Sequence, residues 1–201
     1  MPINIFTTID DPLATTTTIA SGINDAGQIV GQFRDASNRA HGFLLSGGSF
    51  ITIDDPAATG PGSGTFVQGI NDARQIVGSY IDARGSHGFL LSGGTFTTLN
   101  DPLATDGTQA LGINDSGQIV GEYDDATGHH GFLHNLKDGT FTTLDVPGAF
   151  AGTTFALGIN DAGQIVGEYD DASGDGHRTK SAAACRHHRG HDPASRCGWP
   201  L

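Results

Sequence analysis

A ten-residue phrase that occurs four times constrains this chain more than any other feature. It reads GINDAGQIVG in its first and last copies, and the second and third copies each change one residue. The copies begin at Gly22, Gly69, Gly112 and Gly158, at spacings of 47, 43 and 46 residues. A period in this range is typical of repeat architectures in which each copy is one supersecondary unit. The 201 residues suffice for one domain with a hydrophobic core.

Each copy of the phrase predicts a tight β-hairpin. Asn24 and Asp25 can hydrogen-bond to the backbone just ahead of them, which favours a turn. Gly27 can adopt a positive φ where the second strand begins, and the Ile-Val pair that follows is β-branched. Arg74 stands where Gly27 stands in the first copy. If that position is left-handed, the arginine costs about 1 kcal/mol.

Every repeat contains four short runs with strand character, separated by turn residues. The first run leads into the phrase, the second begins at its glutamine, the third contains HGF, and the fourth resembles FTTID. Representative runs are Thr65–Ile70, Gln118–Tyr123, His87–Leu91 and Phe96–Asn100. The short connections between consecutive runs imply antiparallel neighbours.

The strand runs do not alternate cleanly between apolar and polar residues. Phe43, Leu44 and Leu45 are consecutive, for example, and such runs suit sheets that are covered on both faces. Four-stranded antiparallel sheets of ~45 residues that stack around an axis are propeller blades. We therefore expect an all-β fold, a small β-propeller of about four four-stranded antiparallel blades with the last blade incomplete. A β-solenoid is the alternative. Its coils are usually shorter than these repeats, and it would not need three hairpin turns in each repeat.

The repeats define one domain over residues 1–177, followed by a non-repeat basic tail at 178–201. The tail composition fits a disordered segment or a reading-frame change in a GC-rich gene, and its His and Cys residues have no standard zinc-finger spacing. The chain begins with a fourth-strand copy, Ile3–Asp10, which we expect to complete the last blade and close a ring. Because that blade lacks a third strand, tail residues near Thr179–Ala184 could supply one. Alternatively, Ile3–Asp10 pairs with Gln164–Tyr169, or the open edge pairs with another molecule in self-association.

Charge and composition exclude several classes of protein. Residues 1–177 carry five basic and 21 acidic side chains, and such an acidic surface repels the phosphate backbone of nucleic acids. Both cysteines lie in the tail, so the repeats contain no disulfide framework and no Cys-ligated metal. No apolar run is long enough for a transmembrane helix, and the first ten residues lack the features of a signal peptide.

The Asn-Asp pairs in the phrase are the best candidates for a metal site. In a closed ring they would surround one mouth of the central channel, and oxygen ligands suit Ca²⁺. The candidate ligands are Asp25, Asp72, Asp115 and Asp161. The alternative is that these side chains only cap the turn backbone. His41, His87 and His130 begin third strands of different blades, too far apart to share one ion, so we expect each to anchor a hairpin turn.

Adjacent carboxylates recur in the repeats without predicting an active site. Neighbours on an extended chain point apart, and residues that repeat with each blade are typical of a scaffold. The pairs are Asp10-Asp11, Asp54-Asp55, Asp124-Asp125 and Asp170-Asp171. No serine-hydrolase, zinc-protease or phosphate-loop motif is present in the repeats. We expect a non-catalytic binding or structural module without a cofactor, and a Ca²⁺-stabilised binding propeller without catalysis is one alternative to it. The other alternative is a carbohydrate-active propeller enzyme that uses the channel-mouth aspartates, which would need polar residues unique to one blade.

The segments GINDAGQIVG, YDDATGHHGF and HGFLLSGG resemble the HAF repeat family of bacterial extracellular proteins. The family is named for a His-Ala-Phe signature, and the corresponding letters here are His-Gly-Phe at 41–43, 87–89 and 130–132. The resemblance covers about residues 3–177. It implies a repeat-built secreted or surface protein without an assigned catalytic mechanism. The sequence does not identify the ligand, for which a protein and a carbohydrate are the candidates. Because this N-terminus lacks a signal peptide, we expect the chain to be a fragment of a longer gene.

Overall fold

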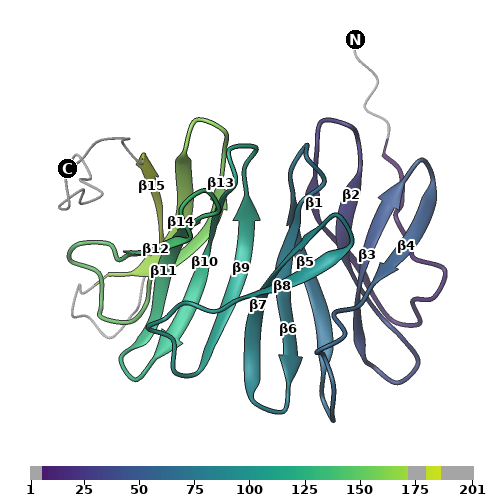
Figure 1. The fold of residues 1–201 in the computed structure, drawn as a ribbon, viewed down its shortest axis with the longest axis horizontal. Coiled ribbons are helices and arrows are strands. Elements are labelled where there is room, and N and C mark those ends of the chain that lie inside the picture. Colours follow the sequence, from purple (N-terminus) through teal and green to yellow (C-terminus); the bar gives the residue numbers. More distant parts are fainter. Residues whose placement is uncertain (1–5, 172–179, 187–201) are drawn as a thin grey trace.

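The structure, a computed structural model, describes residues 6–171 and the strand Lys180–Arg186. Fifteen β-strands make up the fold, and no helix occurs within the described residues (Figure 1). Accordingly, this part of the chain contains no helix that could cross a membrane. The strands fall into four consecutive units, one for each sequence repeat.

The four units have the same strand order. Unit 1 comprises β1 (Thr18–Ile23), β2 (Ile29–Arg34), β3 (Ala40–Ser46) and β4 (Ser49–Ile53). Unit 2 comprises β5 (Gly64–Ile70), β6 (Ile76–Asp82), β7 (Gly85–Ser92) and β8 (Thr95–Leu99). Unit 3 comprises β9 (Gly107–Ile113), β10 (Gln118–Asp125), β11 (Gly128–Asn135) and β12 (Thr140–Leu144). Unit 4 comprises β13 (Phe155–Ile159), β14 (Gln164–Asp170) and β15 (Lys180–Arg186).

Consecutive strands within each unit pair antiparallel. This confirms the predicted all-β class and the antiparallel sheets. Units 2 and 3 are joined by one parallel pair, Ser86 with Gly107, into an eight-stranded sheet. An isolated parallel bridge, His129 with Thr153, lies at the equivalent place between units 3 and 4. The described strands do not close into a ring, because units 1 and 4 form separate sheets at opposite sides of the molecule (Figure 1).

The predicted closing strand at Ile3–Asp10 is the main departure from expectation. Its described residues, 6–10, form no strand, and the Phe6 side chain is 93 % exposed. The chain is instead tied to unit 1 directly afterwards, where the amide of Asp11 donates to Thr18 Oγ1 at 3.1 Å. This local contact holds the segment on the side of the molecule away from unit 4 (Figure 1). The prediction that it pairs with the last unit is therefore wrong for these residues.

Part of the predicted disordered tail supplies a strand. β15 pairs along β14 from Gln164 with Arg186 to Asp170 with Lys180. This confirms the alternative in which tail residues replace the missing third strand of the last repeat. Within the described residues unit 4 has no fourth strand and is incomplete, as predicted. Residues 187–201 lie outside the described part of the chain, so the disorder predicted for them stays a prediction.

Consecutive units pack face to face around apolar clusters. Between units 1 and 2, the side chains of Val30, Leu44 and Ile53 pack with those of Val67 and Ile70. Equivalent clusters lie between units 2 and 3 and between units 3 and 4. Because the middle units are covered on both faces, their strands carry continuous apolar runs instead of alternating ones.

The first strands of successive units approach each other closely at the first glycine of the phrase. A Cβ atom on Gly22 would lie 3.3 Å from the Cα of Gly69, and one on Gly112 would lie 3.2 Å from the Cα of Gly158. Each first strand also has a register shift directly before this glycine, which is a β-bulge. The glycine is therefore required by the backbone contact between units.

Candidate functional site

The asparagine of each phrase closes the turn between the first and second strands of its unit. The backbone amide of Gln28 donates to Asn24 Oδ1 at 3.0 Å, and Asn24 Nδ2 donates to Gln28 Oε1 at 3.0 Å. The same pairing occurs in the other units, between Asn71 and Gln75, Asn114 and Gln118, and Asn160 and Gln164. Each asparagine therefore caps its own turn, which was the alternative to calcium binding in the sequence analysis.

These turns also bind one another across the unit boundaries. Asn24 Nδ2 donates to the carbonyl oxygen of Asn71 at 3.2 Å, and the amide of Asp25 donates to Asp72 Oδ1 at 2.8 Å. The pattern recurs from Asn71 to Asn114, Asp72 to Asp115, Asn114 to Asn160, and Asp115 to Asp161, at 2.8 to 3.1 Å. We call these inter-unit hydrogen bonds the Asn-Asp ladder. The ladder ties every unit to the next at the same end of the sheets.

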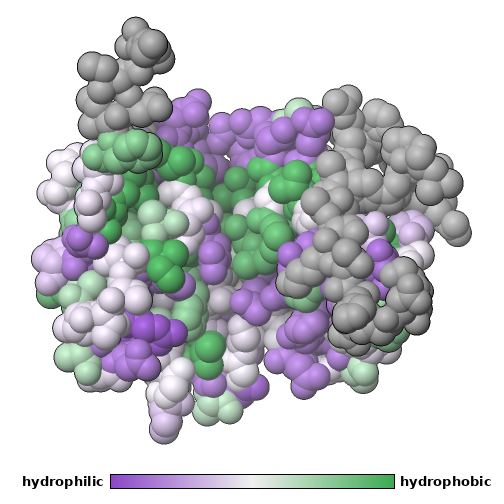
Figure 2. Space-filling view, turned by 180° about the vertical axis from the view of Figure 1, so that it is seen from behind, coloured by the Kyte–Doolittle hydropathy of each residue, from purple (hydrophilic) through white to green (hydrophobic). Residues whose placement is uncertain are grey.

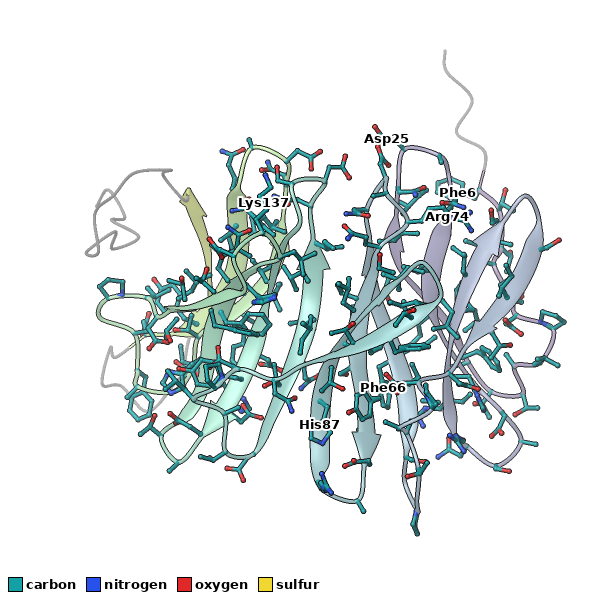
Figure 3. The ribbon with its side chains drawn as sticks, in the orientation of Figure 1. Phe6, Asp25, Phe66, Arg74, His87 and Lys137 are labelled. Carbon is teal, nitrogen blue, oxygen red and sulfur yellow. The ribbon has the colours of Figure 1, made fainter. Side chains whose placement is uncertain are left out.

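The four predicted calcium ligands meet around one opening. A pocket of about 180 Å³ is lined by the Ile-Asn-Asp residues of all four units, at the end where Figure 3 places Asp25. The carboxylates of Asp72, Asp115 and Asp161 each accept an amide of the preceding unit. Within the described residues, no group of three or more His, Cys, Asp or Glu side chains is arranged to hold a metal ion. Calcium binding by Asp25, Asp72, Asp115 and Asp161 stays a prediction.

The histidines of the three His-Gly-Phe segments, His41, His87 and His130, anchor hairpins, as expected. His130 Nδ1 lies 3.0 Å from the carboxylate of Asp145, directly after β12, and its Nε2 lies 3.2 Å from Asp125, the last residue of β10. The His130 ring also stacks on Tyr123 with a centroid distance of 5.1 Å. His41 and His87 make the corresponding contacts in units 1 and 2. His87 lies at the opposite end of the sheets from Asp25 (Figure 3), so these histidines are separate from the Asn-Asp ladder.

Members of the adjacent carboxylate pairs bind different partners. Asp54 contacts His41, whereas Asp55 accepts the amide of Ala57 at 2.8 Å. Asp124 forms an ion pair with His129, while Asp125 binds His130. In these two pairs, adjacent carboxylates therefore point to different partners, as expected for neighbours on an extended backbone.

A larger pocket, of about 610 Å³, opens between units 1 and 2. Its volume lies within the range of small-molecule sites. Apolar side chains from β3, β4, β6, β7 and β8 line it, namely Leu44, Ile51, Ile53, Ile76, Leu91 and Phe96. Asp54 and Arg74 supply charged groups to the same wall. We call this pocket the inter-unit groove.

Arg74 is the most unusual residue of the groove. Its φ is 59°, close to the 71° of Gly27 and the 76° of Gly117 at the same turn position. The predicted left-handed conformation is confirmed, and it is unfavourable for a side chain with a Cβ. Arg74 forms no ion pair with any described residue. Its cationic head is therefore available to a ligand.

The next boundary, between units 2 and 3, is filled differently. The turn between β11 and β12 is longer than that between β7 and β8, and its Leu136 packs against the apolar cluster of units 2 and 3. The amide of Leu136 donates to the carbonyl oxygen of Gly117 at 3.0 Å. In unit 2 the corresponding turn ends in Gly93 and Gly94, which line the groove. Alignment of the repeats would have revealed this difference, because the two turns differ in length and in the leucine.

Unit 3 contains a polar cluster around Glu122 that sequence reasoning missed. Glu122 is buried, its Oε1 accepts Gln109 Nε2 at 2.9 Å, and its Oε2 has no hydrogen-bond partner. His129 lies 3.9 Å from Glu122 and pairs with Asp124. Burial raises the pKa of Glu122, the Asp124 carboxylate raises it further, and His129 partly offsets both. The sequence signal was that Gln32 and Ser79 stand at this position in units 1 and 2, whereas units 3 and 4 have Glu122 and Glu168.

Comparison with models of known protein families gives no match. A search of curated proteins also finds no significant relative. The resemblance to the HAF repeat family therefore rests on the sequences of the repeats alone.

Proposed function

We propose that this chain is a non-catalytic, propeller-like repeat module of the HAF type. Its proposed activity is to bind a small apolar ligand with an acidic group in the inter-unit groove. The observation that supports this function is the groove, which has an apolar wall and, beside it, the strained and unpaired Arg74. Backbone strain of this kind clusters at functional sites.

The propeller-like arrangement is supported by the way successive units meet. First strands contact one another through glycines, and the turns that follow them surround a single pocket. Space is shortest near the axis of a propeller, which explains both the glycines and the small residues of the first strands. Outer strands of each unit then extend away from that axis.

The acidic ligand follows from charge. Arg74 carries a fixed positive charge that a carboxylate or sulfonate can pair with, while the leucine, isoleucine and phenylalanine side chains accept an apolar body. Asp54 on the same wall is occupied by His41 at 2.9 Å, so its charge is partly balanced. For the HAF-type proteins to which the chain is similar, an extracellular location is implied, and we propose it here.

A fluorescent apolar sulfonate, anilinonaphthalene sulfonate, is a suitable probe. We expect saturable binding to the folded chain, with changes in the NMR shifts of the Ala73 and Gly94 amides. Arg74→Gly should weaken binding about fivefold, the scale of one exposed ion pair. Arg84→Gly makes the same charge change in the β6–β7 turn and should leave the affinity unaltered.

A second variant tests the apolar wall. Replacing 92–94 with the longer 135–139 turn of unit 3 places a leucine in the groove, as Leu136 does at the next boundary. Binding of the sulfonate should then be lost while the chain stays folded. Unchanged binding in this variant would refute the groove as the site.

A further inference from the structure

Each outer face of the array corresponds to an internal interface, and among the described residues no further unit covers it. Val30, Val77 and Val120 occupy one position of the second strand, each faces the next unit, and each is fully buried. The corresponding residue of unit 4 is Val166, whose side chain is 53 % exposed. Unit 4 thus presents to solvent a surface that units 1 to 3 bury.

Unit 1 presents the complementary surface. Ile70 and Ile113, at the end of the first strands, face the preceding unit and are 7 % and 8 % exposed. The equivalent residue of unit 1 is Ile23, which is 65 % exposed. Hydrophobic side chains also show on the rear of the molecule beneath a hydrophilic rim (Figure 2).

The Asn-Asp ladder ends in groups of opposite hydrogen-bonding type. Within the described residues, the Asp161 amide has no acceptor, whereas the equivalent amides of Asp25, Asp72 and Asp115 donate to the next unit. At the other end, no described amide donates to the carboxylate of Asp25. The first glycines of the phrase show the same difference. A Cβ on Gly112 would touch Gly158 of the next unit, whereas a Cβ on Gly158 would meet only Val166 of its own unit.

We propose that unit 4 of one molecule packs on unit 1 of a second copy of this chain. The contact would repeat the internal boundary, with Val166 and Ile23 buried and the Asp161 amide donating to the partner's Asp25. The same apolar and hydrogen-bonded geometry occurs three times within the chain, so each face already matches the other. Such a head-to-tail contact is heterologous and builds either a closed ring or an open filament. It differs from edge-strand pairing, because it is formed mainly by packing of sheet faces.

Analytical ultracentrifugation of single variants and their mixture tests this arrangement. Wild-type protein should form dimers or larger species as concentration rises. Ile23→Lys blocks the unit 1 face and Val166→Lys blocks the unit 4 face, so each variant alone should be monomeric. Mixed together, they retain one intact pair of faces and should form dimers and nothing larger. Leu103→Lys, at an exposed loop residue away from both faces, should assemble like the wild type.

Three outcomes would overturn the proposal. A monomeric wild type at millimolar concentration would show that the faces do not associate. Continued assembly of both single variants would indicate pairing through strand edges. A mixture that stays monomeric while both variants remain folded would contradict the head-to-tail geometry.

Discussion

The side-chain amide of Asn24 donates a hydrogen bond to the main-chain carbonyl oxygen of Asn71 at 3.2 Å, across 47 residues of sequence. The same asparagine closes its own turn through Gln28. One side chain therefore determines both the local hairpin and the position of the next unit. Because the asparagine has both functions, the sequence around it is nearly the same in every repeat.

The other residues of the ten-residue phrase also have structural reasons to be the same in every repeat. The first glycine permits contact between first strands, and Gly27 adopts a positive φ in the turn. The final glycine avoids a clash, because a Cβ on Gly31 would lie 2.0 Å from the carbonyl oxygen of Ile19. Val30 fills the boundary with the next unit. The phrase is a set of packing and hydrogen-bonding requirements.

Arg74→Gly should stabilise the chain by about 0.5 to 1 kcal/mol, because glycine adopts the observed positive φ without a Cβ penalty. Chemical denaturation measures the difference. Arg84→Gly, in a turn without a positive φ at that residue, should give no comparable gain. A destabilised R74G protein would mean that arginine contacts outweigh the backbone strain.

The His130 contacts should make stability depend on pH. Burial alone would lower the pKa of His130, but hydrogen bonding and charge from Asp145 and Asp125 raise it above its ordinary value. Because the folded pKa is raised, this stabilisation is present below the unfolded pKa, about 6.5, and is lost as pH rises through the folded pKa.

Asp145→Asn removes the larger of the two carboxylate contributions to His130. Thermal unfolding from pH 5 to pH 8 should then show a smaller decline, by about 0.5 kcal/mol given the solvent exposure of Asp145. An unchanged pH profile would exclude this pair as its source.

Glu122→Gln should stabilise the chain at neutral pH by about 1 kcal/mol, since Gln keeps the bond from Gln109 and removes a buried unsatisfied charge. The pKa of Glu122 is raised, first by burial, so the folded state favours its protonated form. The penalty develops as pH rises from the unfolded pKa through the folded one, and disappears in acid. The advantage of E122Q should therefore vanish at low pH. Equal advantage at every pH would point to packing instead of charge.

Calcium binding at the ladder is testable by ion addition and removal. If the four aspartates bind Ca²⁺, millimolar calcium should raise the melting temperature and EDTA should reverse the change, because a ligand of the native state stabilises it. Magnesium serves as the matched control for ionic strength. Identical melting curves in calcium and EDTA would eliminate the site.

Much of the fold follows from local patterns in the sequence. The predicted runs in units 1 to 3 agree with the observed strands to within two residues, because turn chemistry and β-branched residues act locally. Arg74 was correctly placed in the left-handed region for the same reason. The prediction for Ile3–Asp10 is wrong for its described residues, 6–10. Their sequence matches a fourth strand, but strand formation also requires a partner, which residues 6–10 lack.

The candidate site was harder to predict because it depends on contacts between units. Repetition located the Asn-Asp pairs at one opening, but it could not show that each carboxylate accepts an amide of the preceding unit. The inter-unit groove depends on the lengths of two turns that do not adjoin in sequence. Glu122 was missed because its burial depends on the strands packed around β10, which the residues of β10 alone do not indicate.

Amide hydrogen exchange in an aspartate variant tests the Asn-Asp ladder most directly. The Asp72 amide donates to Asp115 Oδ1 at 2.8 Å, so Asp115→Ala should accelerate its exchange at least tenfold, which corresponds to about 1.4 kcal/mol. Asp25→Ala is the matched control, because no described amide donates to that carboxylate, and the Asp72 amide should keep its wild-type rate. If Asp115→Ala leaves the exchange of the Asp72 amide unchanged, the carboxylates do not join the units, and the ladder is contradicted.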